Sequence, residues 1–229
     1  MAKELEKFWL VDKKKIDFAD MVARSSKILE IEQAALPADP RKIALRENIL
    51  KIESLEFELS DEETRDINES ILKGQNNFPN DLELRYRTIQ SHSGKGMQKL
   101  ITMKGNQRRN GAGGLERNET EFEIDADMIN RLRKLGKDYL MIKTRVIIPD
   151  GNGHIQVNFY TIPTVSFVMV EREFKTDAEV AVYRLPDYLA RLNPASVPGG
   201  PCFGDKILAS EPNLAETQYA EFKRRRFSR

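Results

Sequence analysis

Hydrophobic and polar residues alternate with a period of two over much of the chain between residues 81 and 174. Such alternation in short runs bounded by turn residues predicts β-strands, and tight turns between neighbouring runs predict antiparallel hairpins. The opening residues 4–11 have the same pattern, and residues 27–36 suggest one more strand. The runs are ELEKFWLV, KILEIEQAAL, DLELRYRTI, QKLITMKG, RNETEFEID, YLMIKTRVII, IQVNFYTI and SFVMVEREF.

A helical period replaces this alternation in other segments. Ser60 and Glu63 form a capping-box pattern, and the apolar stripe after it predicts a helix that ends near Gly74. Shorter helices are predicted around residues 16–23 and 126–135. Strands and helices together indicate an α+β protein. A last helical pattern, which runs into the ambiguous segment SLEFELS, consists of Leu45, Ile49 and Ile52.

The charged residues of the strands fall on one face of each strand. Alternate side chains of an extended chain point the same way, so charges at positions i and i+2 share a face. Basic and acidic residues occupy different strands, and the opposite faces are apolar enough to pack against helices. The basic set is Arg85, Arg87, Lys104, Lys143 and Arg145. The acidic set is Glu4, Glu6, Glu119, Glu121, Glu123, Glu171 and Glu173, with Arg117 on the same face as Glu119.

Two arrangements account for these charged faces. Charged strand faces usually meet solvent on one side of an antiparallel sheet. Here, however, Arg and Glu recur strand after strand, and a sheet closed into a barrel would place them across a lumen from one another. Buried like charges are costly unless a ligand neutralises them. A polyphosphate with a divalent metal suits both sets, because Arg and Lys bind phosphate oxygens and carboxylates hold Mg²⁺ or Mn²⁺.

The composition of the chain limits the classes of binding partner and the cellular compartment that the sequence favours. The chain of 229 residues has Lys+Arg 37 against Asp+Glu 36, so no overall field favours nucleic acid or a membrane. No apolar run is long enough to span a membrane. Cys202 is the single cysteine, which excludes an internal disulfide and fits a cytoplasmic protein. The basic tail at residues 223–229 could touch nucleic acid, but such short termini are more often disordered.

The same segments resemble the CYTH, or triphosphate tunnel metalloenzyme, superfamily. ELEKFWLV is similar to its opening E-x-E-x-K strand, LELRYR to its paired arginines, LITMKG to its lysine strand and IKTR to a later basic strand. ETEFEI resembles its acidic strand, VEREF its second E-x-E and GDKILA its last helix. The resemblance implies an antiparallel eight-stranded closed β-barrel, a tunnel with helices packed outside, that binds and hydrolyses triphosphates.

The resemblance also implies roles for individual residues in a metal-dependent triphosphatase whose partner is a small phosphorylated ligand. Glu121 and Lys104 would be catalytic. Mg²⁺ or Mn²⁺ would be held by Glu4, Glu6, Glu171 and Glu173. The substrate phosphates would be bound by Arg85, Arg87, Lys104, Arg117, Lys143, Arg145 and Lys206. The substrates implied are inorganic tripolyphosphate and nucleoside or thiamine triphosphates.

The sequence departs from the family pattern at several positions. Phe8 replaces a lysine, Asn158 replaces a metal-binding aspartate, and residues 37–80 look like a helical insertion in a single domain of residues 1–222. An alternative register makes LEFELS the first strand, with Glu56 and Glu58 as its carboxylates. Two other functions stay open: a degenerate module that captures a phosphorylated nucleotide or signal without turnover, and a structural protein whose charged faces pair with each other.

Overall fold

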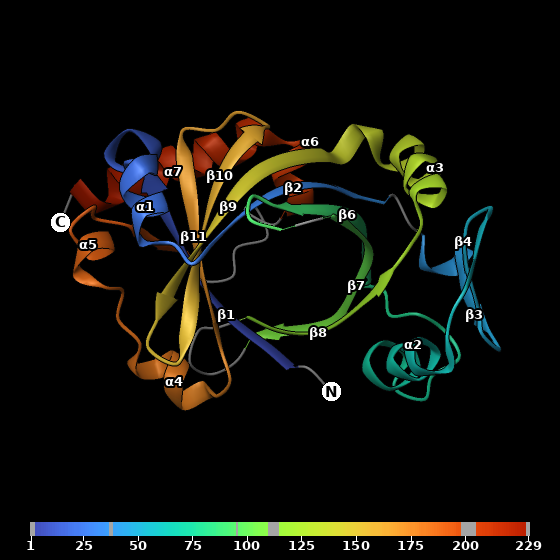
Figure 1. Cartoon of the computed structure of the whole chain (residues 1–229). Helices are drawn as coiled ribbons and strands as arrows, with labels where there is room; N and C mark the ends of the chain where they lie inside the picture. The colour runs from blue at the N-terminus through green and yellow to red at the C-terminus, as the bar shows by residue number, and fades with distance from the viewer. Residues whose placement is uncertain (1–2, 37–38, 95, 110–114, 198–204, 228–229) are drawn as a thin grey trace.

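The largest element of the fold is a nine-stranded antiparallel sheet in the order β11-β10-β9-β2-β6-β7-β8-β1-β12. The computed structural model describes residues 3–36, 39–94, 96–109, 115–197 and 205–227 (Figure 1). The chain is thus the α+β protein with a large antiparallel sheet that the alternation predicts. The strands are β1 (Lys3–Asp12), β2 (Lys27–Ala35), β6 (Glu83–Ser91), β7 (Met97–Arg109), β8 (Leu115–Glu123), β9 (Leu140–Asp150), β10 (Gly153–Ile162), β11 (Phe167–Phe174) and β12 (Ala195–Val197).

Strand β1 is paired with other strands on both of its edges. One edge pairs with β11 over residues 5–12, and the other pairs with β8 over residues 3–6 and with β12 over residues 8–10. The short β12 is a strand beyond the eight expected. The sheet curves strongly, so it has a convex outer face and a concave inner face (Figure 1).

Five helices of the described chain cover the outer face: α1 (Phe18–Arg24), α2 (Asp61–Asp66), α3 (Ala126–Gly136), α4 (Asp177–Val182) and α5 (Asp187–Ala190). Helices α6 (Asp205–Ser210) and α7 (Pro212–Phe227) instead pack on Tyr160 and Met169, which point to the inner face. Short 3-10 turns lie at Lys13–Lys15, Pro40–Lys42 and Lys137–Tyr139. Outward-facing Tyr86 and Ile101 form one core with Leu132 of α3. Trp9, on the apolar face of β1, lies in a second core with Val157 and Val170. The apolar strand faces therefore pack as their alternation predicts.

Residues 43–58 are the main departure from the expected secondary structure. They form β3 (Ile43–Arg46), β4 (Ile49–Ile52) and β5 (Leu55–Glu58), a separate three-stranded sheet. The helix predicted from Leu45, Ile49 and Ile52 is therefore wrong, and the ambiguous segment SLEFELS contains a strand. The turns between these strands contain Glu47 (φ 52°) and Glu53 (φ 53°). Glutamate is rare at positive φ, so neither turn has a sequence signal, and the spacing of the apolar residues imitates a helix.

The same segment decides whether ELEKFWLV or LEFELS is the first strand of the large sheet. Glu56 and Glu58 are exposed on β5, away from the large sheet, so the register that made LEFELS the first strand is wrong.

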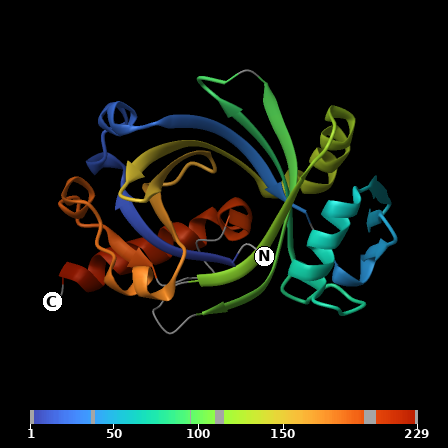
Figure 2. The ribbon, with the colours of Figure 1, turned by 60° about the horizontal axis from the view of Figure 1, so that its bottom comes forward.

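The capped helix is confirmed, since Ser60 and Glu63 form both bonds of a capping box at the start of α2. It continues as a π-helix, Ile67–Leu72, whose apolar residues are buried against the outer face. The small sheet with α2 and the end of α7 lie at opposite ends of the molecule (Figure 2).

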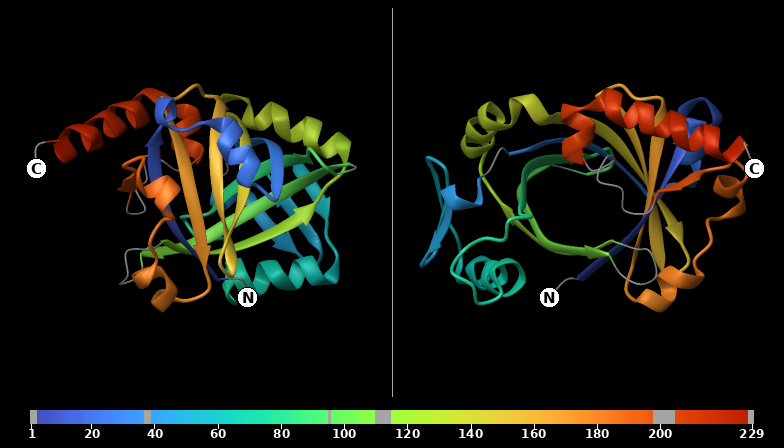
Figure 3. Two further views of the ribbon diagram at one scale, coloured as in Figure 1. Left: turned by 60° about the vertical axis from the view of Figure 1, so that its left-hand side comes forward. Right: turned by 180° about the vertical axis from the view of Figure 1, so that it is seen from behind.

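Helix α7 runs across the strands β10 and β11 (Figure 3, right). Leu208 of α6 and Tyr219 of α7 form a core with Leu10, Tyr160 and Met169. Helix α7 extends to Phe227, so residues 223–227 of the basic tail are helical, not disordered. None of the helices in the described part of the chain combines the length and apolar character needed to cross a membrane.

Candidate functional site

The cross-strand register brings the predicted basic residues onto the inner face. Arg145 on β9 lies opposite Asn158 on β10, and Arg87 on β6 lies opposite Leu100 on β7. Side chains of directly paired residues share one face of a sheet. These residues are also shielded from solvent, because the side-chain exposed fractions are Lys104 5%, Arg87 11%, Arg85 12% and Arg145 14%. Lys143 is 1% exposed, and its Nζ lies 5.7 Å from the centre of the Tyr160 ring.

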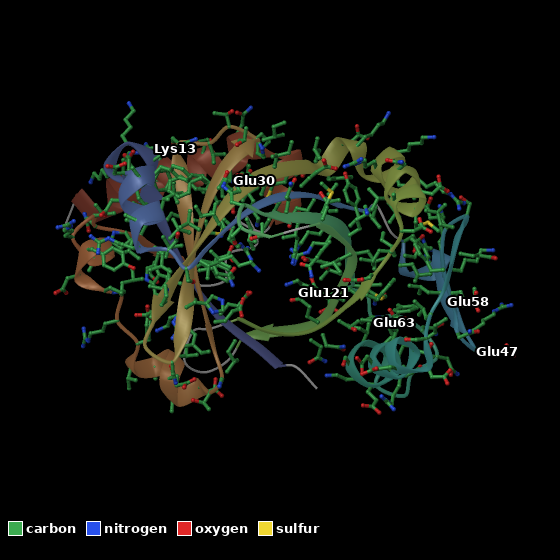
Figure 4. All side chains as sticks on the ribbon, in the orientation of Figure 1. Lys13, Glu30, Glu47, Glu58, Glu63 and Glu121 are labelled. Carbon is green, nitrogen blue, oxygen red and sulfur yellow. The ribbon has the colours of Figure 1, made fainter. Side chains whose placement is uncertain are left out.

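One group of charges joins strands β6, β7 and β8. Arg87 Nη1 is 3.1 Å from Glu121 Oε1, and Thr102 Oγ1 donates a hydrogen bond to the same oxygen at 2.7 Å. Glu119 forms ion pairs with Lys104 and, at 3.6 Å, with Arg85. Glu121 comes from β8 and lies on the inner side of the curved sheet, whereas Glu47 and Glu58 lie on the small outer sheet (Figure 4).

A second group joins strands β9, β10 and β11. Arg145 donates from Nε to Asn158 Oδ1 at 2.8 Å and from Nη2 to Glu171 Oε2 at 3.1 Å. Gln156 Nε2 donates to Glu173 Oε1 at 2.7 Å. One arginine therefore holds both an amide and a carboxylate, and the amide of Gln156 holds Glu173 of β11.

The inner face contains buried polar atoms that have no hydrogen-bond partner among the described residues. Arg87 Nε, Gln156 Oε1 and Asn158 Nδ2 are inaccessible to solvent and form no hydrogen bond with any described residue. Burial, followed by the charges of Arg85 and Arg145, lowers the pKa of Arg87 to about 10, although Glu121 opposes this shift. Buried polar atoms in native proteins are normally paired, so this wall has donors and an acceptor available to a ligand.

The electrostatic environment keeps Glu121 ionised. Burial alone would raise its pKa, but the charge of Arg87 and the Thr102 hydroxyl outweigh that effect, so the pKa of Glu121 is lowered from 4.5. Its side chain is still 34% exposed. The result is a carboxylate that can accept a hydrogen bond from water or a ligand at neutral pH.

This shift predicts a change in acid stability. A carboxyl group with a lowered folded pKa stabilises the fold above its unfolded pKa and loses that contribution as the pH falls below it. Glu121→Gln is therefore expected to flatten the fall in unfolding temperature between about pH 5 and pH 3. Thermal unfolding followed by circular dichroism measures this, with Glu123→Gln on the same strand as control. If the unfolding temperatures of Glu121→Gln and the unmodified protein fall equally between about pH 5 and pH 3, the prediction is wrong.

The predicted metal ligands lie on adjacent strands. Glu6 on β1 is the cross-strand partner of Glu173 on β11, and Glu171 follows at the position opposite Phe8. Glu6 is 4% exposed and Glu171 8%. For Glu4, Arg117 and Lys206 only the backbone is described: Glu4 is paired with Arg117, and Lys206 begins α6 after Asp205.

The donor atoms near Glu6 suit a hard divalent cation. The described residues include no ready group of three carboxylate, histidine or cysteine side chains. Glu6, Glu173 and the free Oε1 of Gln156 nevertheless supply oxygen donors on neighbouring strands. Mg²⁺ and Mn²⁺ are bound by such carboxylate and amide oxygens. The chemistry of these residues therefore fits the implied metal, with Glu171 already engaged by Arg145.

The sequence interpretation passed over several inward residues. Thr102, Glu119 and Gln156 contact the assigned residues directly, but none was given a role. Each lies two positions from an assigned or discussed residue on the same strand, so parity alone could have identified it. His92 lies in the turn after β6, whereas His154 lies on β10, where its Nε2 is 3.3 Å from Gln156 Nε2. Cys202 lies outside the described residues.

These features define a class of protein: an α+β chain whose curved antiparallel sheet carries buried, mutually paired charges on its inner face. No protein-family model and no curated protein matches the sequence. Solved structures do match. The putative adenylyl cyclase HpAC1 from Hippeastrum has a TM-score of 0.51 at 11% identity, covering 94% of this chain and 96% of its own.

Two other solved structures cover most of the chain. The inorganic triphosphatase NE1496 has a TM-score of 0.48 at 16% identity, covering 92% of this chain and 97% of its own. A putative adenylate cyclase from Bacillus halodurans has a TM-score of 0.45 at 14% identity, covering 87% and 96%. The match to HpAC1 shows that the chain shares its fold, which agrees with the fold that the resemblance in the sequence implies.

Proposed function

We propose that this protein is a divalent-metal-dependent hydrolase of a triphosphate-containing substrate, which binds within the curved sheet. The observation that carries the proposal is the cluster of Arg85, Arg87, Lys104, Lys143 and Arg145 on one sheltered face, opposite carboxylates. Pairing of β1 with both β8 and β11 supports treating the eight long strands as a closed tunnel around this face. HpAC1, which shares the fold, is described as having a dominant triphosphatase activity.

The basic residues would bind the phosphate oxygens. Guanidinium groups form paired, charge-assisted hydrogen bonds to phosphate. Arg87 has an unused Nε, and Arg145 is held in one orientation by Asn158 and Glu171. Lys104 would add a positive charge from the neighbouring strand and stabilise charge on the transferring phosphoryl group. We also assign Arg117 and Lys206 to the phosphates, from the resemblance alone.

Glu6 and Glu173, together with Glu4 and Glu171, would hold Mg²⁺ or Mn²⁺. When bound, such a cation neutralises phosphate charge and activates water. Glu121 would orient the attacking water, because phosphoryl transfer depends mainly on positioning and charge stabilisation. Its ionised state and its partial exposure suit that role, and Thr102 and Arg87 fix its direction.

The test is to incubate the protein with Mg²⁺ or Mn²⁺ and, in turn, tripolyphosphate, nucleoside triphosphates and thiamine triphosphate, and to measure phosphate release. Release that EDTA abolishes is expected. Absence of release from every substrate would overturn the proposal. Tight binding without release would instead favour a phosphate-capturing module, for which the amide at Asn158 is the specific observation.

A further inference from the structure

Gln156 has a buried side chain whose two amide atoms differ in their contacts. The residue is 5% exposed and lies on the inner face of β10, next to Asn158 in the inward row. Its Nε2 donates to Glu173 Oε1 at 2.7 Å and lies 3.3 Å from His154 Nε2. Its Oε1 is inaccessible to solvent and has no hydrogen-bond partner among the described residues. The nitrogen of the amide is therefore in use, while the oxygen is available to a ligand.

The contacts of the nitrogen fix the direction of the amide. An ionised carboxylate only accepts hydrogen bonds, so the amide atom beside Glu173 must be the nitrogen. The second amide hydrogen meets His154 Nε2, which then accepts, and the neutral ring carries its own hydrogen on Nδ1. Turning the amide over would place its oxygen against the Glu173 carboxylate. The Gln156 oxygen is therefore a preorganised acceptor that has no favourable alternative orientation.

The acceptor on Gln156 lies apart from the donors of the same wall. Asn158, the next inward residue of β10, has an unpartnered donor, Nδ2, and contacts Arg145 through its oxygen. Donors suit phosphate oxygens, whereas a carbonyl oxygen suits cations and hydrogen-bond donors. Successive inward residues of a strand lie about 7 Å apart. The wall is thus suited to an anion at Asn158 and to a cation one step further along β10.

The neighbours of Gln156 supply further donors for a cation. Glu173 on β11 and Glu6 on β1 are direct cross-strand partners, and Glu6 is 4% exposed. Like charges directly opposite each other destabilise a sheet, and a bound cation offsets that cost. Glu171 is less suitable, because Arg145 Nη2 already donates to its Oε2 at 3.1 Å. Glu6, Glu173 and the Gln156 oxygen therefore offer oxygen donors on three adjacent strands.

We propose that Gln156 Oε1 is a ligand of the divalent cation, together with Glu6 and Glu173, and so takes over from the carboxylate that the family pattern places at residue 158. This inference rests on the proposed function and adds a ligand that the resemblance does not assign. Amide oxygens bind hard divalent cations, and affinity rises with the number of charged ligands. A neutral ligand therefore leaves the site with weaker metal affinity than a carboxylate at residue 156 would give.

The experiment titrates the whole chain with Mn²⁺, without any phosphate compound, and follows the electron paramagnetic resonance signal of the free ion. Gln156→Met keeps the length of the side chain but removes the oxygen, and it should weaken Mn²⁺ binding by at least ~10-fold. Gln156→Glu should bind Mn²⁺ more tightly than the unmodified protein. Gln75, exposed in the turn after the π-helix, provides the matched controls Gln75→Met and Gln75→Glu, which should leave Mn²⁺ binding unchanged.

Three results would overturn the inference while leaving the proposed function intact, provided that the unmodified protein still releases phosphate from tripolyphosphate with Mg²⁺ and EDTA stops the release. The first is no measurable Mn²⁺ binding by the unmodified protein. The second is an affinity of Gln156→Met within about threefold of the unmodified protein. The third is equal weakening in Gln156→Met and Gln156→Glu, which would mean that the amide acts only by orienting Glu173.

Absence of both Mn²⁺ binding and phosphate release would overturn the inference and the proposed function together. Unfolding temperatures measured in EDTA show whether each variant folds, and Gln156→Ala replaces Gln156→Met if the latter unfolds.

Discussion

Arg87→Met is expected to lower kcat/KM for the preferred triphosphate by at least ~100-fold while leaving the unfolding temperature nearly unchanged. A hydrogen bond to a charged group contributes about 1.5–3 kcal/mol, so two bonds to phosphate amount to about 3 kcal/mol or more. Each 1.4 kcal/mol corresponds to roughly a tenfold change in affinity. Removing one partner of a fully buried ion pair is usually destabilising, but here little stability should be lost, because the remaining Glu121 side chain is 34% exposed.

The site explains why the two effects separate. Burial, followed by the charges of Arg85 and Arg145, lowers the pKa of Arg87, so without a ligand its positive charge is disfavoured. Glu121 keeps the Thr102 hydroxyl as a partner when the arginine is removed. The measurements are steady-state phosphate release and the rise in unfolding temperature on adding tripolyphosphate, since a ligand stabilises only a fold that binds it.

Arg133→Met is the matched control. Arg133 forms a 2.7 Å ion pair with Glu32, but it comes from α3 on the outer side and is 42% exposed. It should retain full activity and the full ligand-induced stabilisation. If Arg87→Met keeps kcat/KM within about threefold of the unmodified protein, the assignment of the inner arginines to phosphate is wrong.

The faces of the strands could be predicted from the sequence because side-chain direction in a strand depends only on local parity. Arg85 and Arg87 share a face on β6, and Lys143 and Arg145 share one on β9, as the alternation requires. Parity also places Trp9 on the core side of β1. These inferences need no knowledge of the other strands, so they are robust to errors in topology.

The partners across the site could not be predicted in the same way. Whether Glu119 meets Arg85 or Arg87 depends on the stagger between β6, β7 and β8, and that stagger is set by contacts far apart in the sequence. The structure pairs Glu119 with Arg85 and Lys104, and Glu121 with Arg87. The orientation of the Asn158 amide likewise follows from Arg145, which no local pattern connects to it.

The Asn158 side-chain amide is the basis of the second prediction, a large change in phosphate binding. Asn158 is fully buried, its Oδ1 accepts from Arg145 Nε at 2.8 Å, and its Nδ2 therefore faces away from the arginine, with no described partner. A buried amide donor beside Arg145 and Lys143 suits a phosphate oxygen, whereas an aspartate there would suit a metal. On the proposed function, this departure from the family pattern would convert a cation-binding position into an anion-binding one.

Asn158→Asp is accordingly expected to weaken tripolyphosphate binding in EDTA by about 100-fold, because one charge-assisted hydrogen bond is lost and a negative charge is added near the phosphates. The new carboxylate would also share Arg145 with Glu171. Binding in Mg²⁺ should fall less, since an added oxygen anion favours the metal. Isothermal titration with and without Mg²⁺ measures both. Asn213→Asp, an exposed change on α7, is the charge-matched control.

The two possible roles of Asn158 give opposite results in that titration. If the amide donates to phosphate, Asn158→Asp binds tripolyphosphate more weakly without metal, and its dependence on Mg²⁺ becomes steeper. If the position had merely lost a metal ligand, the metal-free affinity would fall only by the repulsion of the added charge, and Asn158→Asp would raise turnover with Mg²⁺. Equal metal-free affinity in the variant and the unmodified protein would therefore refute the anion-binding role, because an aspartate cannot replace the amide donor when it is ionised.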